Sequence, residues 1–302
     1  MVKLIKNIYN SSDIGRKIFS PLKWCYDYFR VRIVSEITYL KRIYRLKYKL
    51  ELNLDNPKTI QEKYLWLRLN DKTTLKTQCA DKYLVRDFVS ERIGKDYLVP
   101  LLFHTTDPSQ ITSENLPDIP FIIKTNHGCG GHITVHDKTK LNYKKLRRSL
   151  KKALKSNFYY KNREWQYKNI APCIIVEELL SAYNTDILDH KFHCYNGTVH
   201  MIEVYIYEKD GKKLNFYTRN WEKLDMRCKT LGNAEFVKKP KKLNTMIDLA
   251  QKLSTDFKFV RVDMYNINGK IFIGELTFTP AMGLQSYLPD KWSLILGGQL
   301  QL

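Results

Sequence analysis

The chain has 302 residues and a formal net charge of +20, from 51 Lys and Arg against 31 Asp and Glu. Hydrophobic residues make up 43% and aromatic residues 13%, which excludes an intrinsically disordered chain and allows two or three subdomains. The positive surplus favours an anionic partner, such as a nucleic acid, a nucleotide, an acidic glycan or an inner membrane surface; solvated charged faces are the plain alternative.

The sequence has no pattern of a signal peptide, a membrane-spanning segment or a zinc finger. No segment approaches the roughly 18 apolar residues that cross a bilayer, and charges interrupt the N-terminal "MVKLIKNIYNSS" too often for a signal peptide. The six cysteines form no CxxC pair and do not cluster with the seven histidines at zinc-finger spacing. We therefore expect reduced thiols and a cytoplasmic protein, with no nucleic acid as partner because no nucleic-acid-binding motif is found.

Residues 1–55 are predicted to be a basic helical N-terminal region. Lys and Arg alternate with aliphatic and aromatic residues, as in "YLKRIYRLKYKL". Such a segment contacts an anionic membrane peripherally or packs against the rest of the protein, and the sequence leaves both options open for residues 1–50.

Residues 56–118 are predicted to form a helical region that precedes the first sheet. Thr59 and Glu62 have the spacing of a capping box, which marks a helix start. The segment "DKYLVRDFVSERIG" places apolar side chains on one helical face and ends at Gly94, a typical helix stop.

A strand pattern begins at residue 119. "IPFIIKT" and "HITVH" flank the glycine-rich "NHGCGG", so that Lys124 ends a strand and three glycines follow. Glycine lets backbone N–H groups approach an anion, and a lysine adds charge, so the loop is a candidate phosphate flap; an ordinary hairpin is the alternative. A basic amphipathic helix is predicted over 141–156, and "PCIIVEELL" predicts a buried strand that ends in two acids.

The C-terminal part, 181–302, is predicted to be mainly antiparallel. Strands with turns at Asn196-Gly197 and Asp210-Gly211 are followed by a helix over 243–256 and a hairpin over 261–278. The hairpin carries Asp263 and Glu275 inside apolar runs, where an unpaired carboxylate is costly.

The register of this hairpin decides which face each acid occupies. A two-residue Asn268-Gly269 turn would place Asp263 opposite Gly274 and turn Glu275 to the other face. We therefore predict a three-residue loop ending in a G1 bulge at Gly269, which brings Arg261, Asp263, Glu275 and Thr277 to one face. Their hard oxygen donors suit Mg²⁺ shared with phosphates, and a plain Arg261–Glu275 salt bridge is the alternative.

The lysine with its glycine loop, the acid-ended strand and the Asp…Glu-x-Thr hairpin together resemble the ATP-grasp superfamily. Nearly the whole chain is similar to the TupA-like (teichuronopeptide-biosynthesis type) ATP-grasp family of polysaccharide loci, through "LDNPKTIQEKYLWLRL", "ADKYLVRDFV", "FIIKTNHGCGG", "REWQYKN", "DHKFHCYNG", "FVRVDMYN" and "FIGELTFTPAMG". The resemblance implies an α+β ATP-grasp fold. ATP would lie between two antiparallel-sheet subdomains, 119–180 with the flap and 181–302 with the metal hairpin.

The resemblance also implies a role for individual residues. The implied ATP contacts are Lys82, Lys124, the flap residues His127, Gly128, Cys129, Gly130 and Gly131, the hinge residues Glu177, Glu178, Leu179 and Leu180, and Asp189. The implied Mg²⁺ ligands are Asp263, Glu275 and Thr277, and the implied catalytic groups are Arg261 and Lys191. Thr277 stands where the family usually has Asn, and Cys129 where it often has Ser, which leaves metal affinity and rate open.

The implied activity is an ATP- and Mg²⁺-dependent carboxylate–amine ligase that works through an acyl phosphate. The expected substrates are a uronic-acid carboxylate of a surface polysaccharide, capsule or O-antigen, and an amino acid or another amine. Eleven basic residues against one acid between Lys140 and Lys168 fit an acidic glycan. Arg163, Trp165 and Tyr167 are the expected sugar patch, with a packed loop as the alternative, and a glycosyltransferase is the rival activity.

Overall fold

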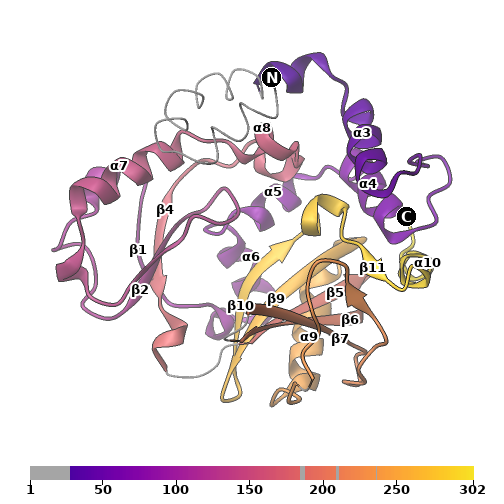
Figure 1. The fold of residues 1–302 in the computed structure, drawn as a ribbon. Helices are drawn as coiled ribbons and strands as arrows, with labels where there is room; N and C mark the ends of the chain where they lie inside the picture. The colour runs from indigo at the N-terminus through magenta and orange to yellow at the C-terminus, as the bar shows by residue number, and fades with distance from the viewer. Residues whose placement is uncertain (1–27, 184–187, 209–210, 236) are drawn as a thin grey trace.

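Two large antiparallel sheets, a third sheet of two short strands and the helices around them make up the computed structural model shown in Figure 1, which describes residues 28–183, 188–208, 211–235 and 237–302. The helices are α3 (Glu36–Tyr48), α4 (Ile60–Asn70), α5 (Thr74–Ala80), α6 (Val85–Ile93), α7 (Tyr143–Leu154), α8 (Phe158–Asn162), α9 (Leu243–Ser254) and α10 (Lys291–Gln299). The strands are β1 (Leu101–Thr105), β2 (Phe121–Thr125), β3 (Ile133–Val135), β4 (Ile174–Glu178), β5 (Asp189–Tyr195), β6 (Thr198–Glu208), β7 (Gly211–Tyr217), β8 (Arg227–Cys228), β9 (Phe259–Ile267), β10 (Lys270–Thr277) and β11 (Tyr287–Leu288).

The first sheet has the strand order β1-β4-β2-β3, with all neighbours antiparallel. Helix α7 packs on it because Leu146 and Leu150, one helical turn apart, are buried in a cluster with Ile123 and Val176. Strand β1 lies upstream of the expected subdomain boundary at residue 119, so the first sheet also takes a strand from the region expected to precede it.

The second sheet has the order β10-β9-β5-β6-β7 and is covered on one face by α9. Met246 and Leu253 of α9 are buried in the same cluster as Val260 and Val262 of β9. The side chains that alternate with this apolar set point to the opposite face of the sheet, where the polar cluster lies. The predicted turn at Asn196-Gly197 is present, whereas Asp210 lies outside the described residues.

The hairpin does not have the predicted three-residue loop. Ile267 pairs directly with Lys270, so the turn is the two-residue Asn268-Gly269, with φ of 53° and 92°. Positive φ at both positions is what a type I′ turn requires. That part of the prediction is wrong.

A β-bulge at Gly274 nevertheless brings the two acids together. The register shifts between Ile273 and Glu275, so Glu275 pairs with Asp263 and Thr277 pairs with Arg261. The bulge also changes which β10 positions face the core: Ile273 is buried before it, and Leu276 is buried after it. One extra residue therefore keeps the strand apolar on the core side while turning Glu275 toward the polar face.

The N-terminal helices pack against the body of the molecule. Tyr39, Leu40 and Tyr44 of α3 are buried with Leu65 of α4, and the Tyr48 hydroxyl donates to the Leu284 carbonyl at 2.8 Å. The packing alternative therefore holds for this helix, while residues 1–27 lie outside the described part of the chain. Within that described part, no helix is both long enough and apolar enough to cross a membrane.

The bulge can be tested by Gly274→Ala. A Cβ at this position would lie 3.0 Å from the Tyr265 ring and 3.3 Å from the Asp263 carbonyl. We expect destabilisation by about 1–3 kcal/mol in urea denaturation, because the crowded ring must shift. The matched control is Gly298→Ala in α10, where an added Cβ meets no atom within 4 Å. Equal stability of Gly274→Ala and wild type would contradict the packing described here.

Candidate active site

A buried ion-pair cluster surrounds Asp263 on the polar face of the second sheet. Arg261 binds it through two hydrogen bonds, Nε to Oδ1 and Nη2 to Oδ2, both 2.7 Å long. Lys191 on the neighbouring strand β5 lies opposite Asp263 in register and donates to the same Oδ2 at 2.5 Å. Asp263 is 3% exposed, so these cations supply the compensation that a buried carboxylate needs.

Glu275 extends the cluster toward the first sheet. Its Oε1 accepts from Thr277 Oγ1 at 2.9 Å and from Arg261 Nη2 at 3.4 Å, and its Oε2 lies 3.8 Å from Lys82 Nζ. Partial burial alone would raise the pKa of Glu275, but the charges of Lys82, Arg261 and Lys191 outweigh it and lower that pKa to about 2. Glu275 is therefore ionised at neutral pH and available to a cation.

Lys82 connects the hairpin to the glycine loop. Its Nζ donates to the Gly128 carbonyl at 2.7 Å, and its backbone N–H donates to the Asn126 carbonyl at 3.1 Å. His127 supports the base of the same loop: its ring is buried and its Nε2 donates to the Ser156 carbonyl at 2.9 Å. Of the expected flap residues, His127 is buried, Gly128 is partly buried, and Cys129, Gly130 and Gly131 are exposed.

The hinge strand β4 carries a second ion-pair cluster. Glu177 lies 2.6 Å from Lys124 Nζ and 3.4 Å from Arg86 Nη1, and all three side chains are largely buried. The backbone N–H groups of the next two residues donate to Pro100 and Pro120 carbonyls, and Leu180 is buried in a small apolar cluster. Lys124 is therefore ion-paired with Glu177 in this structure. To bind a phosphate, as the resemblance implies, Lys124 would have to leave this carboxylate.

Asp189 and Lys191 lie beside Asp263 in the hairpin cluster. Their side chains are 2.7 Å apart, and Asp189 Oδ1 is buried without a hydrogen-bond partner in the described structure. Burial, followed by the Asp263 charge, raises the pKa of Asp189. An unpartnered buried oxygen near the Asp263 carboxylate marks a place where a cationic or hydroxyl-bearing ligand would gain a contact.

The three residues of the expected sugar patch do not lie in one exposed group. Arg163 is 2% exposed, and its two terminal nitrogens donate to the carbonyls of Arg30, Val34 and Ser35, so it ties α8 to the N-terminal segment. This burial does not favour Arg163 as a substrate contact. The single acid of this stretch, Glu164, is also buried and accepts from the Thr279 hydroxyl.

The two aromatic members of that patch lie in different surroundings. Trp165 is half-buried near Arg68 and Lys72. Tyr167 packs edge-on against Phe158 with ring centroids 5.1 Å apart. Tyr167 also packs against the core cluster that contains Leu276 and Phe278. Burial, followed by the charges of Glu164 and Glu275, raises the pKa of Tyr167 well above its usual value. Tyr167 therefore stays a candidate contact for substrate.

Sequence reasoning missed a buried pair behind the site. Glu203 of β6 pairs with Lys191 of β5 in register and is fully buried, with its Oε2 2.8 Å from His193 Nε2. Burial alone would raise the pKa of Glu203, but the hydrogen bond and charge of His193 lower it to about 2. Strict alternation in "HMIEVYIYE" places Glu203 on the face of Lys191, and that signal was available in the sequence.

The donor set fits Mg²⁺ that arrives with phosphate oxygens. Among the described residues, no group of three or more His, Cys, Asp and Glu side chains is arranged to hold a metal ion. The hairpin offers two carboxylates, Asp263 and Glu275, with the Thr277 hydroxyl beside them. Mg²⁺ typically takes one or two carboxylates and completes its shell with phosphates and water, so this incomplete set is what a nucleotide-borne metal needs.

The site is also electrically balanced without a ligand. Three acids face three cations through contacts of 3.8 Å or less, and they are Asp189, Asp263 and Glu275 against Lys82, Lys191 and Arg261. These ion pairs leave no net negative charge to attract a free divalent cation. A metal–nucleotide complex brings phosphates, which can pair with the three cations while the metal pairs with the acids.

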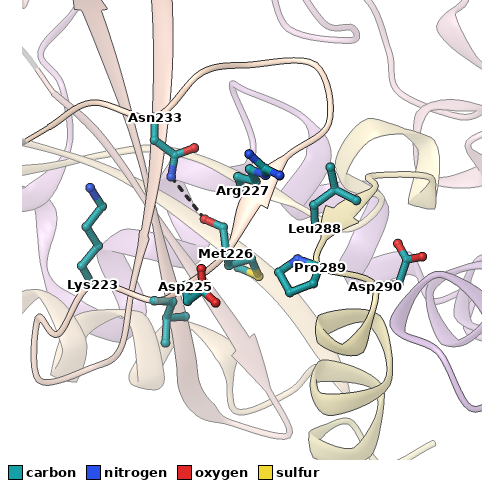
Figure 2. A pocket seen from close by; sticks show the side chains of 9 residues that line it. Lys223, Asp225, Met226, Arg227, Asn233, Leu288, Pro289 and Asp290 are labelled. Carbon is teal, nitrogen blue, oxygen red and sulfur yellow. Dashed lines mark hydrogen bonds between the residues drawn. The ribbon is translucent and has the colours of Figure 1, made fainter.

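A separate pocket of about 900 Å³ lies away from these residues (Figure 2). It is formed by the segment after β7 together with β11, and Asn233 Nδ2 donates to the Met226 carbonyl across it at 3.3 Å. None of the predicted site residues lines this pocket. This pocket is therefore not part of the hairpin cluster.

Two antiparallel sheets, a glycine loop linked to a carboxylate hairpin and a lysine at the end of β2 define the ATP-grasp class of fold. A family model described as TupA-like ATP-grasp matches residues 62–301. The chain belongs to the TupA-like ATP-grasp family.

Solved structures with a similar fold are ATP-grasp ligases of low identity. They include PsnB complexed with a minimal precursor (11% identity, TM-score 0.40, covering 68% of this chain and 54% of that one) and the D-alanine–D-alanine ligase from Bacillus anthracis (16%, 0.43, 72% and 65%). The D-cycloserine synthetase DcsG matches at 11% identity and a TM-score of 0.38, covering 74% and 71%. The chain thus spans about half to two thirds of the first two structures. No curated protein matches it.

The charge balance predicts the effect of Lys191→Met. The substitution keeps the aliphatic stem but removes the cation bound to Asp263, so free Mg²⁺ should bind about tenfold more tightly than to wild type. Titration calorimetry without nucleotide measures this change. Lys252→Met is the matched control, because that lysine is exposed on α9, which covers the opposite face of the sheet, and forms no ion pair within the described chain. Unchanged Mg²⁺ affinity in Lys191→Met would exclude Asp263 as the ligand.

Proposed function

We propose that the chain is an ATP- and Mg²⁺-dependent ligase that joins a carboxylate to an amine through an acyl phosphate. The observation that carries this proposal is the convergence of Asp263, Glu275 and Thr277 beside Arg261, with Lys82 bonded to the glycine flap. Carboxylates for a metal, lysines for phosphates and a backbone flap are the groups that phosphoryl transfer needs, because its catalysis is mainly positioning and charge stabilisation.

The proposed reaction has two steps. An oxygen of the substrate carboxylate attacks the γ-phosphorus, the bond to the bridging oxygen breaks, and ADP leaves. The amine nitrogen then attacks the acyl carbon, loses a proton and displaces phosphate. Bound Mg²⁺ would neutralise charge on the phosphates.

The residues of this chain have distinct parts in that reaction. Lys82 and Lys124 hold the phosphate oxygens, after leaving Gly128 and Glu177 respectively. Arg261 is already fixed by Asp263, so its guanidinium can stabilise the oxyanion of the tetrahedral intermediate without a large rearrangement.

We propose a uronic-acid carboxylate of a surface polysaccharide, in a capsule or O-antigen, as the acceptor, and an amino acid as the amine. Membership in the TupA-like family and the net charge of +20 support this choice. The rival glycosyltransferase is less well supported, because the acids lie on paired strands of a hairpin and the glycine flap would have no use.

A trapping assay tests the ligase. With ATP, Mg²⁺ and galacturonate, hydroxylamine should intercept the acyl phosphate and give a hydroxamate together with ADP. Asp263→Asn should reduce the hydroxamate rate by about 10²–10³-fold, because a group that holds charge in the transition state is lost. Asp225→Asn, at an exposed carboxylate of the Figure 2 pocket, should leave the rate unchanged. Turnover of UDP-galacturonate without ADP formation would contradict the ligase and favour the glycosyltransferase.

Peripheral contact with an anionic membrane at the inner face remains part of the proposal. Ile33, Ile37 and Leu46 are 78%, 45% and 62% exposed, among basic residues of the α3 region such as Lys41 and Arg42. Exposed apolar side chains beside cations are typical of interfacial helices.

This contact is tested with phosphatidylglycerol-containing vesicles. Ile33→Ser with Leu46→Ser should lower the bound fraction in co-sedimentation by about tenfold, because two insertable apolar side chains are lost. The control is Ile119→Ser with Leu294→Ser, two exposed apolar residues elsewhere. Equal loss in both double variants, or none in either, would refute a specific contact through α3.

A further inference from the structure

Helix α7 has one face made entirely of cations. The exposed basic residues of the helix and its C-cap follow a helical spacing and form the cationic face, which consists of Lys144, Lys145, Arg148, Lys151, Lys152 and Lys155. The opposite face packs on the first sheet through Leu146 and Leu150. At 1.5 Å per residue, the cationic face is about 16 Å long, with charge on every turn.

Neighbouring acids do not neutralise this face. No ion pair to any of its six cations is formed within the described chain, although Arg147, on the flank of the helix, donates to the Ile111 carbonyl. Asp118 and Asp137 are engaged with Lys138 and Lys140 instead. The pKa of Asp107 is lowered mainly by hydrogen bonds from Ser109, and Lys151 is the smallest of the causes. Asp107 forms no ion pair with Lys151.

The burial of Glu164 removes the other acid of this region. It is the single carboxylate between Lys140 and Lys168, and its side chain is 5% exposed and bonded to Thr279. Like charges one turn apart on a helix repel one another. The cationic face is therefore an unfavourable arrangement for α7 alone, and an external polyanion would relieve the repulsion.

The position of the face relates it to the nucleotide flap. Lys155 precedes Ser156, whose carbonyl accepts the hydrogen bond from His127 at the base of the flap. The helix lies along the outer side of the first sheet in Figure 1. A chain bound along α7 would thus approach the flap at the C-terminal end of the helix.

We propose that the cationic face of α7 binds the acceptor as a polymer, namely a glycan that carries carboxylates at regular intervals along its chain. This inference rests on the proposed function for the class of acceptor. Its own evidence is charge complementarity: a row of cations, mostly lysines, suits a row of separate carboxylates. It assigns the contact with the acceptor chain to the helix that packs on the first sheet.

The composition of the face distinguishes this occupant from other polyanions. None of the exposed large apolar residues in the described chain lies on α7, in contrast to the α3 region with Ile33, Ile37 and Leu46. Membrane-binding helices insert apolar side chains, and single-stranded nucleic acids are bound on aromatic platforms. The cationic face has neither, which favours a flexible glycan.

Binding to polygalacturonate tests the proposal. The triple variant Lys145→Gln, Arg148→Gln and Lys152→Gln removes three charges and retains good helix formers. We expect at least a tenfold loss of affinity in calorimetry at 150 mM NaCl, with a shallower salt dependence. The matched control removes three exposed cations elsewhere, as Lys238→Gln, Lys239→Gln and Lys252→Gln, and should change affinity less than twofold.

Additional readouts separate this inference from the ligase proposal. Circular dichroism and binding of a non-hydrolysable ATP analogue should be the same in both triple variants and wild type. Hydroxamate formation from free galacturonate, which tests the ligase alone, should also be unchanged, while the KM for polygalacturonate rises at least tenfold in the α7 variant. Unchanged polygalacturonate affinity in that variant would overturn the proposal. Tighter α7-dependent binding to duplex DNA or to anionic vesicles than to polygalacturonate would overturn it too, in favour of that partner.

Discussion

The bidentate contact between Arg261 and Asp263 is the interaction on which the candidate site depends. It places a buried carboxylate and a buried guanidinium on one strand, two residues apart, and fixes both by two hydrogen bonds. Removing either partner would leave an uncompensated buried charge, which costs about 3–5 kcal/mol. Lys191 and Glu275 join this pair from the strands on either side, so three adjacent strands are connected through one carboxylate–guanidinium unit.

The pair also explains why the polar face of the second sheet can be functional while the sheet stays stable. The apolar face packs under α9, and the buried Glu203–His193 pair lies on the same polar face, next to Lys191. Groups that are already hydrogen-bonded and packed keep their geometry when a ligand arrives, which lowers the reorganisation needed for catalysis.

Much of the fold was predictable because the local patterns were strong. The capping box at Thr59 and Glu62 is formed at the start of α4, and the strands on both sides of the glycine loop lie where alternation placed them. The predicted loop and register of the hairpin are wrong, and the four polar side chains share one face because of the bulge at Gly274. The β10 positions that pack in the cluster under α9 switch from odd to even between Ile273 and Leu276, which is the signature of a bulge.

Other features could not be read from local sequence. Arg163 was grouped with Trp165 and Tyr167 as a sugar patch, yet its hydrogen-bond acceptors lie about 130 positions earlier in the chain. Lys82 and Lys124 were expected near phosphates, but their present partners, Gly128 and Glu177, depend on how distant segments pack. Likewise, the α7 cations lack ion pairs within the described chain because nearby acids bind other groups: Glu164 accepts from Thr279, and Asp118 and Asp137 pair with Lys138 and Lys140.

The internal charge balance has a consequence for how nucleotide binding responds to ionic strength. Proteins that hold anions with bare cations release solution ions on binding, and their affinity falls steeply with salt. Here Lys82, Lys124, Lys191 and Arg261 already have carboxylates of the same chain as counter-ions. With the proposed site residues, binding of a metal–nucleotide complex would exchange ions inside the protein: its phosphates would replace carboxylates around the lysines, and the freed carboxylates would hold its metal. Few solution ions would take part, so nucleotide binding would depend less on ionic strength than the proposed binding of a polyanion along α7.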